Sequence, residues 1–222
     1  MKKKILALCL VVVLAVTAVT GATLAYFTDT ADTKTNTFTV GNVEIKLDEP
    51  NWDADGSEDA PDVYPGEALA KDPIVTNMGE NPCFVRVKVT GLDALKDAGA
   101  GNITLRWIDE AGVYHDGYNT RDWELIGDYY YYKKPLCVTG TESEEWNAGL
   151  TDVTTPVFSQ IVIPTDLENA VDANGDGVLD AESYDVLVDA YAVQAQGARA
   201  SWTQVKAMTP AEIAAWFTTC GM

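Results

Sequence analysis

The stretch KDPIVTNMGENPCFVRVKVTG, residues 71–91, decides the fold class of this chain. Two segments in which apolar and polar side chains alternate flank a turn at Gly79–Pro82. Alternation with a period of two is typical of β-strands, and Gly, Asn and Pro are typical of the turns between them. Residues 71–91 are therefore predicted to form a β-hairpin whose second strand carries Phe84, Val85 and Val87.

The same period recurs along the chain. It is found in NTFTVGNVEIKL (36–47), YYYY (129–132), PVFSQIVIP (156–164) and SYDVLVDAYAVQAQGA (183–198). Tyr129–Tyr132 are predicted to face both sides of a sheet, and Val186, Val188, Ala190 and Ala192 to share one face of their strand.

Two acidic loops, 51–67 and 139–155, interrupt the strands, and helical signals are confined to 208–217. There Thr209 is the expected cap, followed by Pro210 and Glu212. The chain is predicted to be all-β: an antiparallel, jelly-roll-like β-sandwich with long acidic loops and a short C-terminal helix.

The start of the chain has the layout of a secretory signal. Lys2–Lys4 precede an apolar run, and small residues follow up to Ala25. Cleavage is predicted between Ala25 and Tyr26; the alternative is an uncleaved anchor over 5–27. The predicted organisation is a signal peptide (1–25), an extended N-terminal segment (26–40), a jelly-roll-like domain (41–200) and a C-terminal helical segment (201–222).

The net charge limits the possible partners. The chain has 15 basic and 34 acidic residues and a formal charge of −19, which becomes −22 (−19 − 3) once Lys2–Lys4 are removed. Such a charge repels nucleic-acid phosphates and anionic membranes. Nucleic acid is therefore excluded as a partner, and cations are favoured.

The best local motif for a cation is DANGDGVLDAES, residues 172–183. Its spacing matches a calcium loop, with Gly177 at the sharp turn. The candidate Ca²⁺ ligands are Asp172, Asn174, Asp176, the carbonyl of Val178, and Asp180. Ser183 stands where a bidentate Glu is expected, so Glu182 or Asp185 would have to substitute; the alternative is a solvated acidic turn.

A weaker calcium candidate lies in DADGSED. Asp53, Asp55, Ser57 and Asp59 alternate there, which could place their oxygens around one cation. Asp and Gly also make turns without any ion, so the alternative is again a plain turn.

Cysteine and histidine are sparse. Beyond the signal the cysteines are Cys83, Cys137 and Cys220, with no close spacing typical of zinc sites. They could form one internal disulfide, cross-link two chains or stay unpaired. The only histidine, His115, is expected in a loop, and no catalytic motif surrounds it.

The N-terminal stretch ATLAYFTDTADTKTNTFTVGNVEIKL resembles the head of the TasA/camelysin (CalY) family of Gram-positive bacteria. The matching features are a small residue followed by an aromatic pair and an Asp, then a Phe, a Gly and an alternating strand: Ala25, Tyr26, Phe27, Asp29, Phe38, Gly41 and 43–47. YPGEALAKDPIVTNMGENPCFVRVKV (64–89), DYYYYKKPL, PVFSQIVIP and YAVQAQGA also resemble pieces of such proteins.

The resemblance implies a jelly-roll protein exported through a SipW-type signal peptidase and assembled, with itself and other matrix proteins, into biofilm fibres. Tyr26 to about Val40 would be a donor strand for the next subunit. Camelysin has been classed as a metallopeptidase, but no recognisable zinc ligands are present, so no enzyme activity is expected.

The predicted function is thus a secreted structural protein of the extracellular matrix or cell surface. The alternative is an adhesive surface module, stiffened by calcium and held by an uncleaved anchor. A camelysin-like peptidase is the less favoured third reading.

Overall fold

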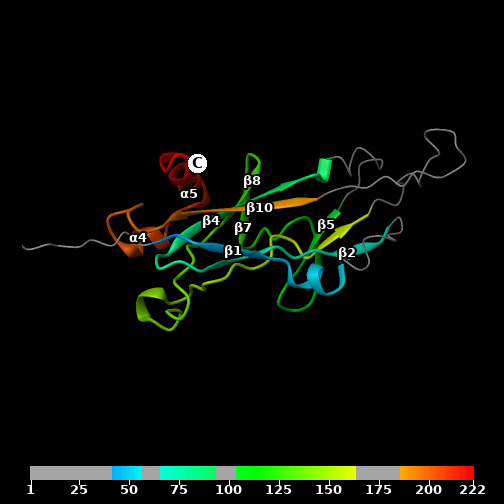
Figure 1. Cartoon of the computed structure of the whole chain (residues 1–222), viewed down its shortest axis with the longest axis horizontal. Helices are drawn as coiled ribbons and strands as arrows, with labels where there is room; N and C mark the ends of the chain where they lie inside the picture. Colours follow the sequence, from blue (N-terminus) through cyan, green and yellow to red (C-terminus); the bar gives the residue numbers. More distant parts are fainter. Residues whose placement is uncertain (1–41, 57–65, 94–103, 164–185) are drawn as a thin grey trace, which may run out of the picture. The chain divides into compact units, whose positions relative to one another are not determined.

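The computed structural model describes residues 42–56, 66–93, 104–163 and 186–222. All of them lie in one compact unit, Gly41–Met222. Strands dominate this unit, and helices are short (Figure 1). Within the described ranges, no helix combines the length and apolar character needed to cross a bilayer.

One antiparallel sheet has the strand order β10-β4-β8-β7. Its strands are β4 (Cys83–Thr90), β7 (Trp123–Ile126), β8 (Tyr129–Tyr132) and β10 (Leu187–Gln194). The pairing of β10 with β4 runs from Leu187 opposite Thr90 to Gln194 opposite Cys83. Among the described strands, β10 and β7 are therefore the edges of this sheet.

The opposing layer consists of a two-stranded sheet, β1-β3, and a four-stranded sheet, β2-β9-β5-β6. Its strands are β1 (Ile45–Asp48), β2 (Ala68–Ala70), β3 (Ile74–Asn77), β5 (Thr104–Ile108), β6 (Tyr114–Asp116) and β9 (Gln160–Val162). The N–H of Thr154 donates to the carbonyl of Val75 (2.9 Å), and the N–H of Asn77 donates to that of Asp152 (2.8 Å). These bonds join β3 to the segment that leads into β9, so the two small sheets form one layer.

The core between the layers is built from alternate residues of each strand. Val85 and Val87 of β4 and Tyr130 and Tyr132 of β8 contribute to it, together with Val75 of the opposing layer. Tyr131 points to the opposite face of β8, which confirms that this aromatic strand serves both sides of its sheet. The antiparallel, sandwich-like all-β fold is confirmed, and the jelly-roll strand order stays a prediction.

The predicted hairpin over 71–91 is wrong. β3 pairs with β1, whereas β4 pairs with β10 and β8, so the chain crosses from one layer to the other at the turn. The reason is the burial of β4 on both faces. Val85 points into the core between the layers and Phe84 points to the other side, where helices cover the sheet. A strand buried on both faces takes a central position, with a partner along each edge.

A second core lies between the outer face of this sheet and the C-terminal helices α4 (Trp202–Lys206) and α5 (Pro210–Thr219). The predicted cap of α5 is confirmed: Thr209 and Glu212 form a reciprocal capping box, and Pro210 opens the helix. Helix α5 contacts β7 and β8 (Figure 1) and buries Phe217 against Tyr131.

Candidate functional site

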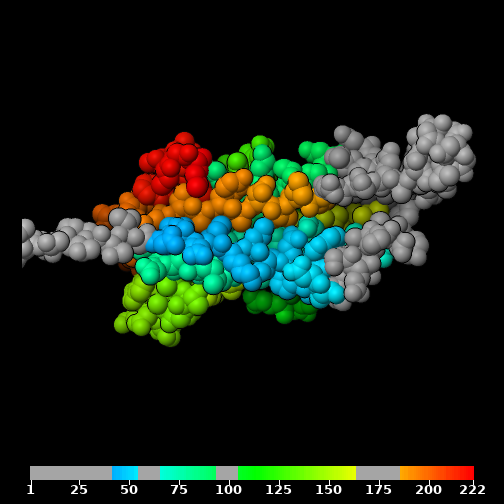
Figure 2. All heavy atoms as spheres, viewed as in Figure 1, coloured from blue at the N-terminus to red at the C-terminus, as the bar shows by residue number. Residues whose placement is uncertain are grey.

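A cleft of about 300 Å³ opens where the end of β1 meets the start of β10. Both edge strands lie side by side on one face (Figure 2), but no ladder of hydrogen bonds joins them among the described residues. The cleft is lined by the end of β1 and the following turn (47–49), Asp53, Lys71 and the start of β10 (186–188).

One wall of the cleft is apolar. Leu47 from β1 and Val186 and Val188 from the β10 side line it while packing only partly against the core between the layers. The side chain of Leu187 points to the other face of β10 and is 60% exposed. This side of the sandwich therefore leaves apolar surface and two strand edges in one place.

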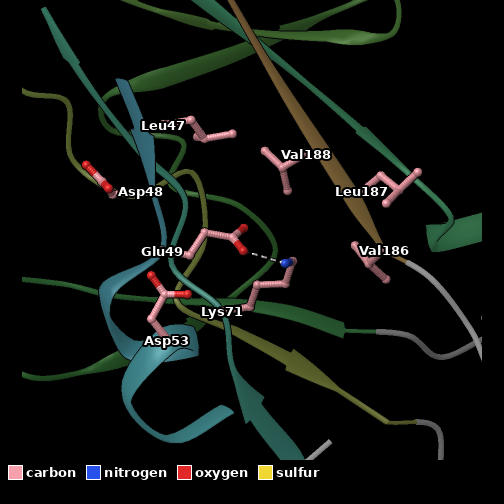
Figure 3. A pocket seen from close by; sticks show the side chains of 8 residues that line it. All are labelled: Leu47, Asp48, Glu49, Asp53, Lys71, Val186, Leu187 and Val188. Carbon is pink, nitrogen blue, oxygen red and sulfur yellow. Dashed lines mark hydrogen bonds and ion pairs between the residues drawn. The ribbon is translucent and has the colours of Figure 1, made fainter. Parts of the chain in front are cut away.

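The opposite wall is charged. The ammonium group of Lys71 lies 2.7 Å from Glu49 Oε2, with 7% and 17% of the two side chains exposed. Figure 3 shows the two side chains pointing toward one another in the cleft. Lys71 also lies over the ring of Trp52, 4.7 Å from its centroid. Trp52 belongs to the helical turn η1 (Trp52–Gly56), which closes this end of the cleft.

Negative charge exceeds positive charge in the cleft. Asp48, Glu49 and Asp53 line it together with one lysine. Asp48 pairs with the exposed Lys46 at 2.8 Å, whereas Asp53 has no ion pair with any residue that the structure describes. The second oxygen of Glu49, Oε1, is buried and accepts no hydrogen bond from the described part of the chain. The cleft can therefore still accept a hydrogen-bond donor or a cation.

Asp72 fixes the position of the charged wall. Its carboxylate accepts hydrogen bonds from the main-chain N–H of Asn51 (2.8 Å) and from the side-chain amide of Asn51 (3.0 Å). Burial raises the pKa of Asp72 above its usual range, although these hydrogen bonds oppose the shift. The two hydrogen bonds between Asn51 and Asp72 hold the start of η1 beside Lys71.

The predicted calcium ligands are placed unevenly. Asp172, Asn174, Asp176, Val178 and Asp180 lie outside the described residues, as do Ala25 and Tyr26 of the predicted cleavage site. Of the weaker candidates, Asp53 lies at the cleft and Asp55 lies in the same turn, η1, whereas Ser57 and Asp59 are outside the described ranges.

The three cysteines are free thiols. Cys83 and Cys137 are buried and Cys220 is exposed. The main chain of Cys83 exchanges two hydrogen bonds with Leu136 (3.1 and 2.8 Å), which brings the segment around Cys137 to the start of β4. Burial raises the pKa of the Cys83 thiol to about 12, and nearby Cys137 adds to the shift. Burial also raises the pKa of Cys137.

His115 lies in β6 rather than in the expected loop. Its ring stacks on Trp107, with centroids 4.7 Å apart, and its Nε2 is 2.8 Å from Asp109 Oδ2. In the described part of the chain, no three His, Cys, Asp or Glu side chains group to hold a metal ion. The described residues therefore do not fit a catalytic zinc, which needs three protein ligands. The absence of peptidase activity stays a prediction.

Sequence reasoning missed Glu49 and Lys71 as members of a site. Glu49 lies between the predicted strand 36–47 and the acidic loop 51–67, and Lys71 begins the predicted hairpin, 22 positions away. A weak signal was present: KDP interrupts the strand pattern between Leu69 and Ile74. A charge within a strand pattern can mark a buried pair, but its partner cannot be identified without the fold.

Comparison with known proteins gives one match. The model of the family described as camelysin metallo-endopeptidase matches residues 1–99, which include β1 to β4. No curated protein and no solved structure matches the chain. The resemblance seen in the sequence is thus confirmed over residues 1–99, which match the camelysin family model.

Proposed function

We propose that this chain is a secreted structural protein of the bacterial cell surface or biofilm matrix. It assembles into fibres when the N-terminal segment 26–40 of one copy adds as a strand to the next. The proposal is carried by one observation: the edge strands β1 and β10 lie together beside a partly apolar cleft. The family match over residues 1–99 supports it.

The edge of β10 suits the addition of a strand. β10 is eight residues long and carries one charged side chain, Asp189. Natural edge strands are usually shortened or charged because their free N–H and C=O groups pair with other chains. Val188, Ala190 and Ala192 pack only partly against the core. A further strand would bury these side chains and pair the free backbone groups.

The segment 26–40 suits the role of donor. Six threonines favour an extended backbone: Thr28, Thr30, Thr33, Thr35, Thr37 and Thr39. Phe38 and Val40 fall on one face of such a strand and can meet the small side chains Ala190 and Ala192. Export by a SipW-type peptidase would free Tyr26 and release this segment.

Electron microscopy of two purified chains tests the proposal. Residues 26–222 should form filaments, whereas residues 40–222 should stay monomeric with an unchanged circular dichroism spectrum. A free peptide of residues 26–40 should inhibit assembly of 26–222, and the same peptide with Phe38→Asp and Val40→Asp should not. Equal filament formation by both chains would overturn strand donation. If both stay monomeric, the adhesive, anchored module becomes the better reading.

Calcium binding remains part of this proposal. The loop ligands Asp172, Asn174 and Asp176 would hold Ca²⁺ and stiffen the domain. Calorimetric titration with CaCl₂ should give one site that is lost in Asp172→Asn/Asp176→Asn. The matched control Asp53→Asn should retain it. No heat in the unmodified chain would overturn the calcium proposal.

A further inference from the structure

The cleft at the end of β1 and the start of β10 is lined by more carboxylates than ammonium groups. Asp48, Glu49 and Asp53 line the cleft with one lysine, Lys71, which pairs with Glu49. Asp48 pairs with Lys46, outside the lining, whereas Asp53 has no ion pair with a described residue. The buried Glu49 Oε1 accepts no hydrogen bond from the described residues. A buried carboxylate oxygen without a donor costs free energy. The orphan oxygen and the charge excess both indicate a cationic hydrogen-bond donor as the missing partner.

We infer that this partner is Lys34 of a second copy of the chain. Its ammonium group enters the cleft, donates to Glu49 Oε1 and thereby fixes the register of the donated strand. This inference rests on the proposed strand donation and names the contact that aligns it. The bound state has Glu49 between two ammonium groups, Lys71 of its own chain and Lys34 of the donor.

The composition of the donor supports this choice. Within residues 26–40, Lys34 is the only basic residue, and Asp29 and Asp32 are acidic. Of the charged side chains in the segment, only Lys34 complements an acidic cleft. The remaining polar side chains of the segment are neutral and carry no charge preference.

The strand period supports it as well. Lys34, Asn36, Phe38 and Val40 are all at even positions, so they share one face of an extended chain. When Phe38 and Val40 face the core, Lys34 faces the same side. Lys34 then lies about 14 Å from Phe38, at about 3.4 Å per residue. On the receiving side, Val186 and Val188 at the cleft likewise lie four residues before Ala190 and Ala192, respectively.

A slip by one residue would be costly. It would turn Phe38 toward solvent and place Thr33 or Thr35 at the carboxylates. A threonine-rich strand has little else to set its register. A single cation at the end of the apolar face removes this ambiguity, much as one polar residue fixes register in other assemblies.

The test measures the critical concentration for assembly of residues 26–222 by light scattering, with filaments checked by microscopy. Lys34→Glu should raise this concentration at least tenfold. The matched control Thr35→Glu, which adds charge on the opposite face of the strand, should change it less than twofold. Asp53→Asn should raise the critical concentration two- to threefold, because it removes one negative charge from the cleft. Asp53 is exposed, so this variant should keep its fold.

Charge reversal gives the decisive arm. Lys34→Glu combined with Asp53→Lys should recover most of the loss, whereas Lys34→Glu combined with Asp128→Lys, on the β7–β8 turn, should not. Raising NaCl from 50 to 500 mM should weaken assembly of the unmodified chain more than that of Lys34→Met.

The two proposals fail in different ways. If residues 40–222 assemble as well as 26–222, strand donation itself is wrong. If assembly requires the segment but Lys34→Glu and Thr35→Glu behave alike, only the contact between Lys34 and the cleft is wrong. Failure of Asp53→Lys to rescue better than Asp128→Lys would also overturn it.

Discussion

The side-chain amide of Asn77 donates a hydrogen bond of 2.9 Å to the main-chain carbonyl of Cys137. Asn77 is fully buried, and the same amide donates to the carbonyl of Asn81, while its oxygen accepts from the N–H of Gly79. One side chain thus closes the turn between the two layers and ties it to a segment 60 residues away.

Asn77→Ala should therefore lower the free energy of unfolding by roughly 3 kcal/mol, because it leaves the buried carbonyl of Cys137, the buried N–H of Gly79 and the half-buried carbonyl of Asn81 without this partner. Urea unfolding followed by circular dichroism measures this. The control Asn42→Ala removes only an exposed 3.4 Å contact to Glu44 and should change stability by less than about 0.5 kcal/mol. Similar midpoints for the two variants would contradict the role of Asn77.

Gly79→Ala tests the attachment of β1. An added Cβ would lie 2.5 Å from the carbonyl oxygen of Asn42 and 2.7 Å from the nitrogen of Glu44. Overpacking against backbone costs about 1–3 kcal/mol. The amides of Met78 and Glu80, which donate to Glu44 and Asn42, should exchange with deuterium much faster.

Gly112→Ala is the matched control for this variant. Its φ of +79° makes any side chain strained, but no atom lies within 4 Å of the added Cβ. It should cost roughly 1 kcal/mol without changing exchange at Met78 or Glu80. Unchanged exchange in Gly79→Ala would mean that β1 is not held by this close approach.

Arg86 holds the C-terminal helices without a carboxylate. Its guanidinium carbon lies 3.9 Å from the ring centroid of Tyr129 and 4.7 Å from that of Phe217, and Nη1 donates to the hydroxyl of Tyr131 (3.3 Å). Arg86→Ala should cost roughly 2–4 kcal/mol through lost packing and cation–π contacts. Hydrogen exchange across α5 should rise.

Arg86→Met separates packing from charge. It keeps most of the volume and removes a buried charge that no described carboxylate neutralises, so stability should stay within about 1 kcal/mol of the unmodified chain. A loss in Arg86→Met as large as that in Arg86→Ala would show that the cation, rather than its volume, holds α5 in place.

Acid should loosen α5 before the sheets. The main-chain N–H and hydroxyl of Thr209, followed by Arg199, lower the pKa of Glu212 to about 2 from its usual 4.5. The contribution of this carboxylate to stability is complete above pH 4.5 and is lost as the pH falls toward about 2. Exchange of α5 amides should accelerate over this window, and Glu212→Gln should remove the pH dependence. An equal acceleration in the sheet amides would contradict a local effect.

Thiol labelling should distinguish the cysteines. With iodoacetamide at pH 8, Cys220 should react fast, because it is exposed, while Cys83 and Cys137 react only as fast as the domain opens. Mass spectrometry of folded residues 26–222, which lack Cys9, should therefore show one early adduct. Three adducts at equal rates, or a mass lower by two hydrogen atoms because of a disulfide, would contradict the buried free thiols.

Local pattern predicted strand faces well and strand partners poorly. The parity of Tyr129–Tyr132 and the shared face of Val188 and Ala190 follow from the period of the sequence alone. The partner of β4 does not, because its hydrogen bonds go to β10 and β8 rather than to its neighbour in sequence, β3. The same limit applies to the cleft, since Glu49 meets Lys71 only once β1 has paired with β3, across more than 20 intervening residues.

The pairing of β4 with β10 also sets the order in which the chain can fold. β4 is complete at Thr90, but the strand along one of its edges begins at Leu187 and ends at Gln194. Synthesis starts at the N-terminus, so this sheet cannot close until nearly the whole chain has been made. Strands this far apart in the sequence also pair slowly. Until Gln194 has been made, β4 lacks its partner along that edge, and the folded sheet cannot be complete.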